Sequence, residues 1–450
     1  MRAAGVLAVI SLVGGVAAEA QTSLTIYQDG RVLQRRTLPV RVPAGASSHQ
    51  LALGQFDLGS LFALDSGLAI TGAQYDAAQD QTNALRRAVG RQLAFATRGP
   101  NGAREITMAD VMAVDPERYR LEDGRVTFQA PGIPLFPAEL VPLQSSLLVG
   151  IKSEKPRTTL GLGFFSGGAS WNAAYAITLG KGTARVAGHA AIQVGTIRAD
   201  SVEVQLLAGN VGSAPKTFQG RGPLAREASM AMADMGASEQ QVGEAHLYTL
   251  PGRLAFVPGV ETSAALFEPA AAPLERTYTV RGQLPYWGGL PQSGDEQIEP
   301  VNVTYIIKRP AKTEFGDRPV PGGTVRLYER DAAGRPQLVG ESSVGHTAAG
   351  QDLRLDAGTA FDLTARRLQT AYETRLEGKR TVAMATYAVT IANAKDSVVS
   401  VDVLEQRGGE WTVVSSSVAA EKVSSTITRF RVKVPARGET TLTYRVRVVW

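Results

Sequence analysis

The stretch PGGTVRLYERDAAGRPQLVGESSVGHTAAGQDLRLDAGTAFDL, from Pro321 to Leu363, indicates the fold more clearly than any other part of the chain. It alternates short apolar runs with segments rich in Asp and Gly, which is typical of consecutive β-strands joined by turns. The same period-two alternation recurs in three sets: Trp171, Ala173, Tyr175, Ile177 and Leu179; Val202, Val204 and Leu206; Tyr387, Val389 and Ile391. Such strands bury one face only. The sequence therefore predicts an all-β protein of antiparallel β-sandwich domains with at most one or two short helices.

Three dipeptides that contain glycine predict hairpins. Asp-Gly stands between apolar residues in the segments Tyr27–Val32 and Leu121–Val126, and Gly408-Gly409 stands between Leu404 and Trp411. Tight hairpins favour these dipeptides because both central residues take a positive φ. One helix is expected over residues 82–90, where Leu85, Ala88 and Val89 have helical spacing and Gly90 is a C-terminal stop.

Residues 1–20 have the pattern of a signal peptide, with a positive n-region, an apolar core and the cleavage motif Ala18-Glu19-Ala20. We therefore expect a periplasmic or secreted protein with no transmembrane segment after cleavage. The chain has no cysteine, so burial rather than disulfide bonds must stabilise it. Its charge of +5 comes from scattered arginines without a block of five like charges. This favours an ordinary solvated surface over attraction to acidic polysaccharide, and no nucleic-acid partner is expected.

Composition divides the mature chain in two. Residues 21–150 are expected to form an N-terminal β-rich domain that closes at the proline-rich stretch 131–142. Residues 151–450 are expected to form a C-terminal β-sandwich region, with a further division near residue 285. The segment Pro223–Glu244, rich in Ala, Glu, Gln and Met, fits either a surface helix or an insertion.

The stretch Pro321–Leu363 also resembles the C-terminal domain of unknown function of bacterial mucoidy-inhibitor-like proteins. Gly167–Leu179, Val202–Gly212 and the closing block 381–446 resemble other strands of that domain. The resemblance implies an exported, β-rich envelope protein and identifies no catalytic residue. Full-length members carry a coiled coil, whereas this chain has no sustained heptad pattern, so a role that depends on the coil is not implied.

Metal-binding patterns are weak. The four histidines are isolated from one another, without a His-x-x-x-His pair: His49, His189, His246 and His346. His346 is read as a hydrogen-bonded turn histidine. Met230, Met232 and Met235 form one thioether cluster that suits Cu(I), although such methionines more often fill irregular contacts.

Catalytic patterns are weaker still. Ser213 and Lys216 match Ser-x-x-Lys, but Pro215 opposes the helix that this motif needs. Glycines 161, 163 and 167 miss the dinucleotide-binding spacing. Carboxylates that distant strands could bring to one cleft, as in glycosidases, are Glu203, Asp362, Asp402 and Glu410. Tyr286 and Trp287 are a candidate stacking platform.

The sequence thus predicts an exported, non-catalytic β-protein that binds or scaffolds a cell-envelope component, either a protein or a polysaccharide. No catalytic, cofactor-binding or metal-ligating residue is assigned, and no cofactor is expected. Two alternatives stay open: a hydrolase of envelope polysaccharide that uses a carboxylate pair, and a periplasmic Cu(I)-binding protein that uses the methionine cluster.

Overall fold

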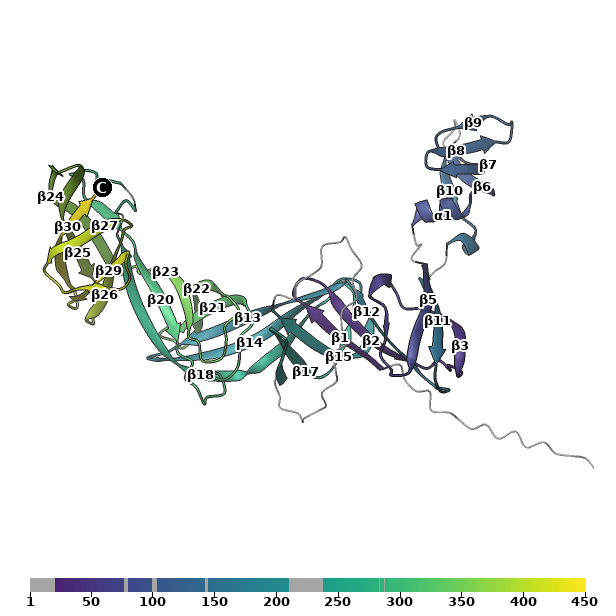
Figure 1. Cartoon of the computed structure of the whole chain (residues 1–450), viewed down its shortest axis with the longest axis horizontal. Helices are drawn as coiled ribbons and strands as arrows, with labels where there is room; N and C mark the ends of the chain where they lie inside the picture. Colours follow the sequence, from purple (N-terminus) through teal and green to yellow (C-terminus); the bar gives the residue numbers. More distant parts are fainter. Residues whose placement is uncertain are drawn as a thin grey trace, which may run out of the picture. The chain divides into compact units, whose positions relative to one another are not determined.

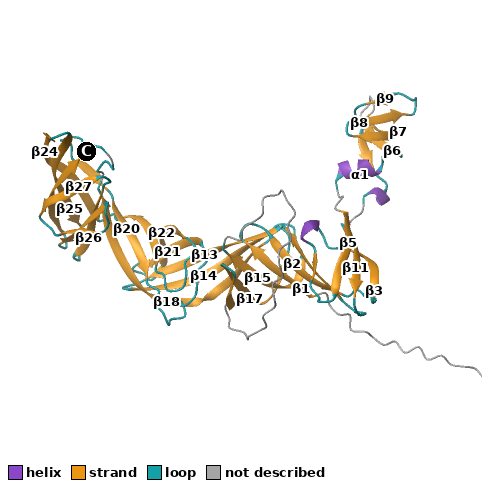
Figure 2. Ribbon diagram, in the orientation of Figure 1, coloured by secondary structure: helices purple, strands orange, loops and turns teal. Residues whose placement is uncertain are grey.

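A computed structural model describes residues 21–76, 80–98, 103–141, 145–209, 238–282, 284–286 and 288–450. The predicted signal peptide lies outside these residues. Strands dominate the described chain, and the all-β prediction is confirmed (Figures 1 and 2). None of the described helices is long and apolar enough to cross a membrane.

The chain divides into two compact units. The first comprises Met1–Ser170, Gln193–Gln205 and Gly252–Val260. The second comprises Trp171–Ile192, Leu206–Pro251 and Glu261–Trp450. Each unit therefore combines segments that are far apart in the sequence.

A seven-stranded sheet has the order β16-β17-β15-β1-β2-β12-β4. Its strands are β1 (Gln21–Tyr27), β2 (Val32–Leu38), β4 (Phe62–Ala63), β12 (Leu160–Ser166), β15 (Ala199–Ala208), β16 (Ser238–Val242) and β17 (Ala245–Phe256). A three-stranded sheet has the order β3-β11-β5, with β3 (Gly45–Leu51), β5 (Leu68–Asp76) and β11 (Ser146–Ser153). The inward side chains of β11 and β12 belong to one apolar cluster, which includes Val149, Ile151, Leu162 and Phe164.

A five-stranded sheet lies between β5 and β11 in the sequence and has the order β10-β6-β7-β8-β9. Its strands are β6 (Gln92–Arg98), β7 (Arg104–Val114), β8 (Glu117–Leu121), β9 (Val126–Thr127) and β10 (Ile133–Leu135). The predicted helix is confirmed as α1 (Gln81–Arg87), which begins where the Asp80 side chain accepts the Asn83 amide. Leu85 of α1 packs in the core of this sheet, and Gly90 has the positive φ expected of a stop.

Two further sheets form the bulk of the second unit. A ten-stranded sheet follows the path β22-β21-β13-β14-β18-β26-β29-β28, with β20 and β23 off that path. Its strands are β13 (Ala169–Leu179), β14 (Thr183–Val194), β18 (Glu261–Arg281), β20 (Val301–Ile307), β21 (Gly323–Arg330), β22 (Pro336–Val344), β23 (Leu353–Thr359), β26 (Val399–Gln406), β28 (Ala420–Lys422) and β29 (Ile427–Val434). The other sheet has the order β19-β24-β25-β30-β27. It consists of β19 (Gln297–Glu299), β24 (Leu363–Glu377), β25 (Arg380–Asn393), β27 (Glu410–Ser416) and β30 (Gly438–Val449).

The alternating residues predicted to be inward are buried. In β13, all five members of the set from Trp171 to Leu179 are at most 4% exposed. In β25, Val389 and Ile391 are fully buried, in one cluster with Val401 of β26 and Val432 of β29. Side chains of two sheets thus meet in this cluster, which is the packing of a β-sandwich.

Two of the three predicted hairpins are confirmed, with a different turn geometry. β1 and β2 pair antiparallel around Asp29-Gly30, but only Gly30 has a positive φ, +88°. Asp29 instead accepts hydrogen bonds from the amide and the guanidinium of Arg31, at 3.1 and 2.8 Å. The β8–β9 turn repeats this arrangement with Asp123, Gly124 and Arg125. Each turn therefore needs one glycine with a positive φ and an aspartate that accepts hydrogen bonds from the arginine two residues later. It does not need two left-handed residues.

The third predicted hairpin is wrong. Gly408 and Gly409 connect β26 to β27, but β26 pairs with β18 and β29, whereas β27 pairs with β30. The connection therefore passes from one sheet of the sandwich to the other. The apolar residues that flank the glycines fit this crossing as well as a hairpin, because both arrangements bury one face of each strand.

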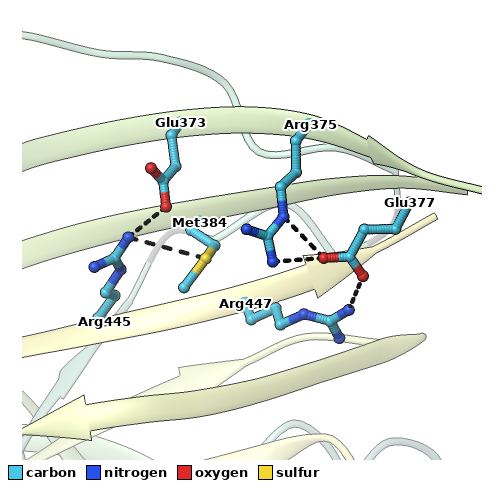
Figure 3. A network of polar contacts seen from close by, with 6 residues as sticks. All are labelled: Glu373, Arg375, Glu377, Met384, Arg445 and Arg447. Atoms are coloured by element: carbon cyan, nitrogen blue, oxygen red, sulfur yellow. Dashed lines mark hydrogen bonds and ion pairs between the residues drawn. The ribbon is translucent and has the colours of Figure 1, made fainter.

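The outer face of the β24-β25-β30 layer carries a ladder of ionic contacts (Figure 3). Arg447 Nη2 lies 2.6 Å from Glu377 Oε2, and Arg375 Nε lies 2.8 Å from the other carboxylate oxygen, Oε1. Arg445 pairs with Glu373. Arg375 and Arg447 hold the pKa of the Glu377 carboxyl below its usual range. This face of the sandwich is charged and exposed to solvent.

Candidate anion-binding groove

The four histidines, none of which the sequence assigned as a metal ligand, lie on separate elements. His49 Nε2 lies 2.9 Å from a serine hydroxyl of its own strand. His246 Nδ1 lies 2.7 Å from Glu239 Oε1 across the β16–β17 hairpin. His346 Nδ1 accepts a hydrogen bond from a backbone amide at 3.1 Å, as expected of a turn histidine. His189 is exposed on β14. In the described part of the chain, no three His, Cys, Asp or Glu side chains are grouped to hold a metal ion.

The predicted carboxylates are not paired with one another either. Glu203 lies on β15 of the first unit, and the other three belong to the second unit. Each of those three is held by a cation of its own: Asp362–Lys395 at 3.1 Å, Asp402–Arg431 at 3.0 Å and Glu410–Arg380 at 2.8 Å. An ion-paired carboxylate on a strand surface has the ordinary role of a solvated salt bridge.

The structure does bring two buried carboxylates, Glu299 and Glu405, to one cation. Arg367 Nε lies 2.5 Å from Glu299 Oε1, and Arg367 Nη2 lies 2.5 Å from Glu405 Oε1. Glu299 is 1% exposed and Glu405 is fully buried. A glycosidase needs its two carboxylates in an open cleft, so this buried pair lends no support to hydrolysis.

Several other candidates fall on residues that are not described. Met230, Met232 and Met235 lie there, as do Ser213, Lys216 and Trp287. The Cu(I) alternative therefore stays a prediction. Gly161 and Gly163 lie within strand β12, and a Cβ at Gly163 would meet the ring of Phe62 on β4. These glycines serve strand packing, as their place outside a strand-to-helix turn implies.

The first unit contains a groove of about 890 Å³ that the sequence did not reveal. It is lined by β1 and β2, by the start of β15 and the residues before it, and by β17, which neighbour one another in the seven-stranded sheet (Figure 1). Its charged lining residues are Arg36, Arg198, Arg253 and Asp200. Three arginines and one aspartate give a formal charge of +2. The groove therefore favours an anion.

Arg36 is held by hydrogen bonds and by an aromatic ring. Its Nε and Nη2 atoms lie 3.2 and 2.9 Å from Gln34 Oε1. Gln34 is 4% exposed, and its own Nε2 donates to Ser166 Oγ at 2.8 Å. The Arg36 guanidinium also lies over the ring of Phe164, 5.8 Å from its centroid. A chain of three polar side chains and one aromatic ring thus fixes the direction of the guanidinium.

Arg36 has no acidic partner among the described residues, since neither its hydrogen bonds nor its ring contact involves a carboxylate. Burial lowers its pKa, because no carboxylate compensates for the water that the guanidinium has lost. Such a half-buried cation gains free energy when a ligand supplies the missing negative charge.

The opposite wall of the groove is polar as well. Arg253 donates from Nε to Ser201 Oγ at 2.8 Å and from Nη2 to the Ser201 carbonyl oxygen at 2.9 Å. Three threonines complete the hydroxyl lining: Thr22, Thr37 and Thr159. A carboxylate or phosphate could thus accept from the guanidinium groups while neighbouring hydroxyls bond to the rest of the ligand.

One feature of the sequence pointed to Arg36. On the alternation of β2, residues 32, 34 and 36 share a face, so Gln34 and Arg36 continue an inward row that begins with the fully buried Val32. A polar pair in an inward row indicates a polar interior.

We find no family model, no curated protein and no solved structure that matches the chain.

Proposed function

We propose that this protein is an exported, non-catalytic binding protein of the cell envelope, and that its Arg36 groove takes the acidic group of an envelope polysaccharide. The observation that carries the proposal is the position of Arg36. Its guanidinium is held by Gln34 in a groove of positive charge and has no carboxylate partner among the described residues. The envelope location rests on the signal-peptide pattern of residues 1–20 and on the resemblance of several strand sequences to the C-terminal domain of mucoidy-inhibitor-like proteins.

The fixed position of the Arg36 side chain supports a role in ligand binding over the role of an ordinary surface charge. Because Gln34 and Phe164 already fix Arg36, little side-chain entropy remains to be lost when a ligand binds. The volume of about 890 Å³ lies in the range of ordinary ligand pockets. Planar guanidinium groups match the two oxygens of a carboxylate.

The lining favours a saccharide over other anions. Four hydroxyl side chains line the groove beside its charged residues: Thr22, Thr37, Thr159 and Ser201. A uronic acid offers ring hydroxyls to such groups and a carboxylate to the arginines. We therefore expect acidic sugars to bind and neutral sugars of the same size to bind far more weakly.

The test is a calorimetric titration of the chain comprising residues 21–450 with trigalacturonate, and with maltotriose as the neutral probe. We expect Arg36→Gln to weaken trigalacturonate binding at least about tenfold, since a charge-assisted hydrogen bond is worth about 1.5–3 kcal/mol. Arg36→Lys keeps the charge but loses the planar fork, so an intermediate affinity is expected.

Arg86→Gln is the matched control, because Arg86 is an exposed arginine of α1 that does not line the groove. It should bind trigalacturonate like the parent protein. The proposal is abandoned if Arg36→Gln and Arg86→Gln bind equally well, or if maltotriose binds as tightly as trigalacturonate.

A further inference from the structure

A second basic groove, of about 810 Å³, lies entirely within the second unit. The turn between β13 and β14 forms one wall, and β18 and the end of β21 form the others. Its charged lining residues are Lys181, Arg185, Arg276, Arg330 and Glu329. Four cations against one carboxylate give a formal charge of +3, higher than in the Arg36 groove.

The four cations are not equally engaged. Arg276 Nη2 lies 3.5 Å from Glu329 Oε2, and its guanidinium lies 5.0 Å from the centroid of the Tyr305 ring. Arg330 Nη1 donates to a backbone carbonyl at 2.6 Å. Lys181 and Arg185 are exposed, and their side chains form no hydrogen bond or ion pair with any residue that the structure describes. Two cations are therefore fixed at the wall, and two are available at the turn.

The turn that carries Lys181 is itself well defined. The Gly180 amide donates to the Thr183 carbonyl oxygen at 2.8 Å, and Gly182 takes a φ of +74°. The Leu274 amide of β18 donates to the Gly182 carbonyl oxygen at 2.9 Å, which anchors the turn to the neighbouring strand. A left-handed glycine allows this close turn, and the anchored backbone keeps Lys181 beside the groove.

We propose that this groove binds the phosphate monoester of a saccharide. A phosphate monoester carries about 1.5 to 2 negative charges at neutral pH and three acceptor oxygens. It therefore matches a site with four cations from three separate elements better than a single carboxylate does. The groove is far larger than one phosphate group, and the hydroxyls of Thr178 and Thr183 in its lining suit an attached sugar.

This inference does not depend on the Arg36 groove, because the two grooves share no lining residue. The test is a calorimetric titration of the same 21–450 chain with glucose 1-phosphate, inorganic phosphate and glucose. We expect glucose 1-phosphate to bind most tightly and glucose not to bind. The double variant Lys181→Gln/Arg185→Gln should weaken glucose 1-phosphate binding at least tenfold.

Arg326→Gln is the matched control, since Arg326 lies on β21, pairs with Glu341 at 3.0 Å and is outside the groove. Arg86→Gln, which lies outside both grooves, should also leave glucose 1-phosphate binding unchanged. Unaltered binding by the double variant would overturn the site. Inorganic phosphate binding as tightly as glucose 1-phosphate would overturn the saccharide part of the proposal.

Discussion

Arg367 Nη2 lies 2.5 Å from Glu405 Oε1 in the interior of the C-terminal sandwich, and the same carboxylate oxygen accepts the Tyr444 hydroxyl at 2.6 Å. Glu299 binds the Nε of the same guanidinium. The four residues come from β24, β26, β30 and β19, so the cluster joins both sheets of the sandwich. Two carboxylates share one cation, and one oxygen of each, Oε2, has no hydrogen-bond partner. The cluster therefore holds surplus negative charge unless it also holds a proton.

Removing the shared cation, Arg367, should strongly destabilise the sandwich. Arg367→Met leaves two buried carboxylates without compensation, so we expect the sandwich to lose about 3–5 kcal/mol of unfolding free energy. Hydrogen exchange of peptides that cover β25 measures the local value. Arg445→Gln, on the exposed face of the same sheet and paired with Glu373, is the control and should cost less than about 1 kcal/mol. Similar losses for the two variants would contradict this assignment.

The cluster should also make the stability of the sandwich depend on pH. Burial raises the pKa of the Glu405 carboxyl, and Arg367 opposes this only in part. A carboxyl with a raised pKa in the folded state contributes stability below its unfolded pKa of about 4.3 and loses it as the pH rises through the folded pKa. The loss is at most about 1.4 kcal/mol for each pH unit.

Glu405→Gln removes this titration and leaves one carboxylate for one guanidinium. We expect its stability relative to the parent protein to increase as the pH rises above the unfolded pKa of about 4.3, as measured by hydrogen exchange of β25. The increase follows from the linkage between protonation and folding. Parallel stability curves for the two proteins would show that Glu405 is not the titrating group.

Three glycines near β21 and β22 should respond differently to alanine. A Cβ at Gly323 would meet the carbonyl oxygen of Ala173 on the parallel neighbour β13, so Gly323→Ala should cost about 1–3 kcal/mol. Gly334 has open space but a φ of +79°, so Gly334→Ala should cost about 1–2 kcal/mol. Gly345 has neither constraint, and its alanine variant should stay within about 0.5 kcal/mol. Chemical denaturation ranks the three, and a costly Gly345→Ala would refute this explanation.

Salt should distinguish the two grooves. Arg36 is half-buried, whereas Lys181 and Arg185 are exposed, and ions screen exposed charges more effectively. Raising the salt concentration from about 0.05 to about 0.5 M shortens the screening length several-fold, so glucose 1-phosphate should lose more affinity than trigalacturonate. Titrations at the two concentrations measure the difference. Equal losses would indicate that Arg36 binds through exposed charge alone.

Local patterns were sufficient for several of the strands and for the helix. The alternation from Trp171 to Leu179 predicted a strand, which is β13 in the structure. The helical spacing over residues 82–90 predicted a helix, which is α1. Local patterns did not identify which strands pair with one another, as Gly408 and Gly409 show. Their local pattern fits a hairpin, yet the flanking strands bond to β29 and β30. Backbone hydrogen bonds are the same for every residue type, so a strand sequence does not specify its partner.

Polar residues that stand in inward rows of strands indicate buried polar sites. Glu405 continues the buried row Val399, Val401 and Val403, just as Arg36 continues the row from Val32. The alternation alone places such residues inside. It does not say which distant strand supplies the counter-charge, nor whether one exists.

The sequence by itself determined that this protein is built of strands, which faces of those strands are buried and where several of its turns lie. These features depend on the side-chain alternation and the backbone freedom of neighbouring residues. Only the tertiary structure decided that Arg36 and Arg253 line one groove and that Arg367 is shared by Glu299 and Glu405. Those contacts join residues far apart in the chain, and charges interact through space at distances that only the folded backbone sets.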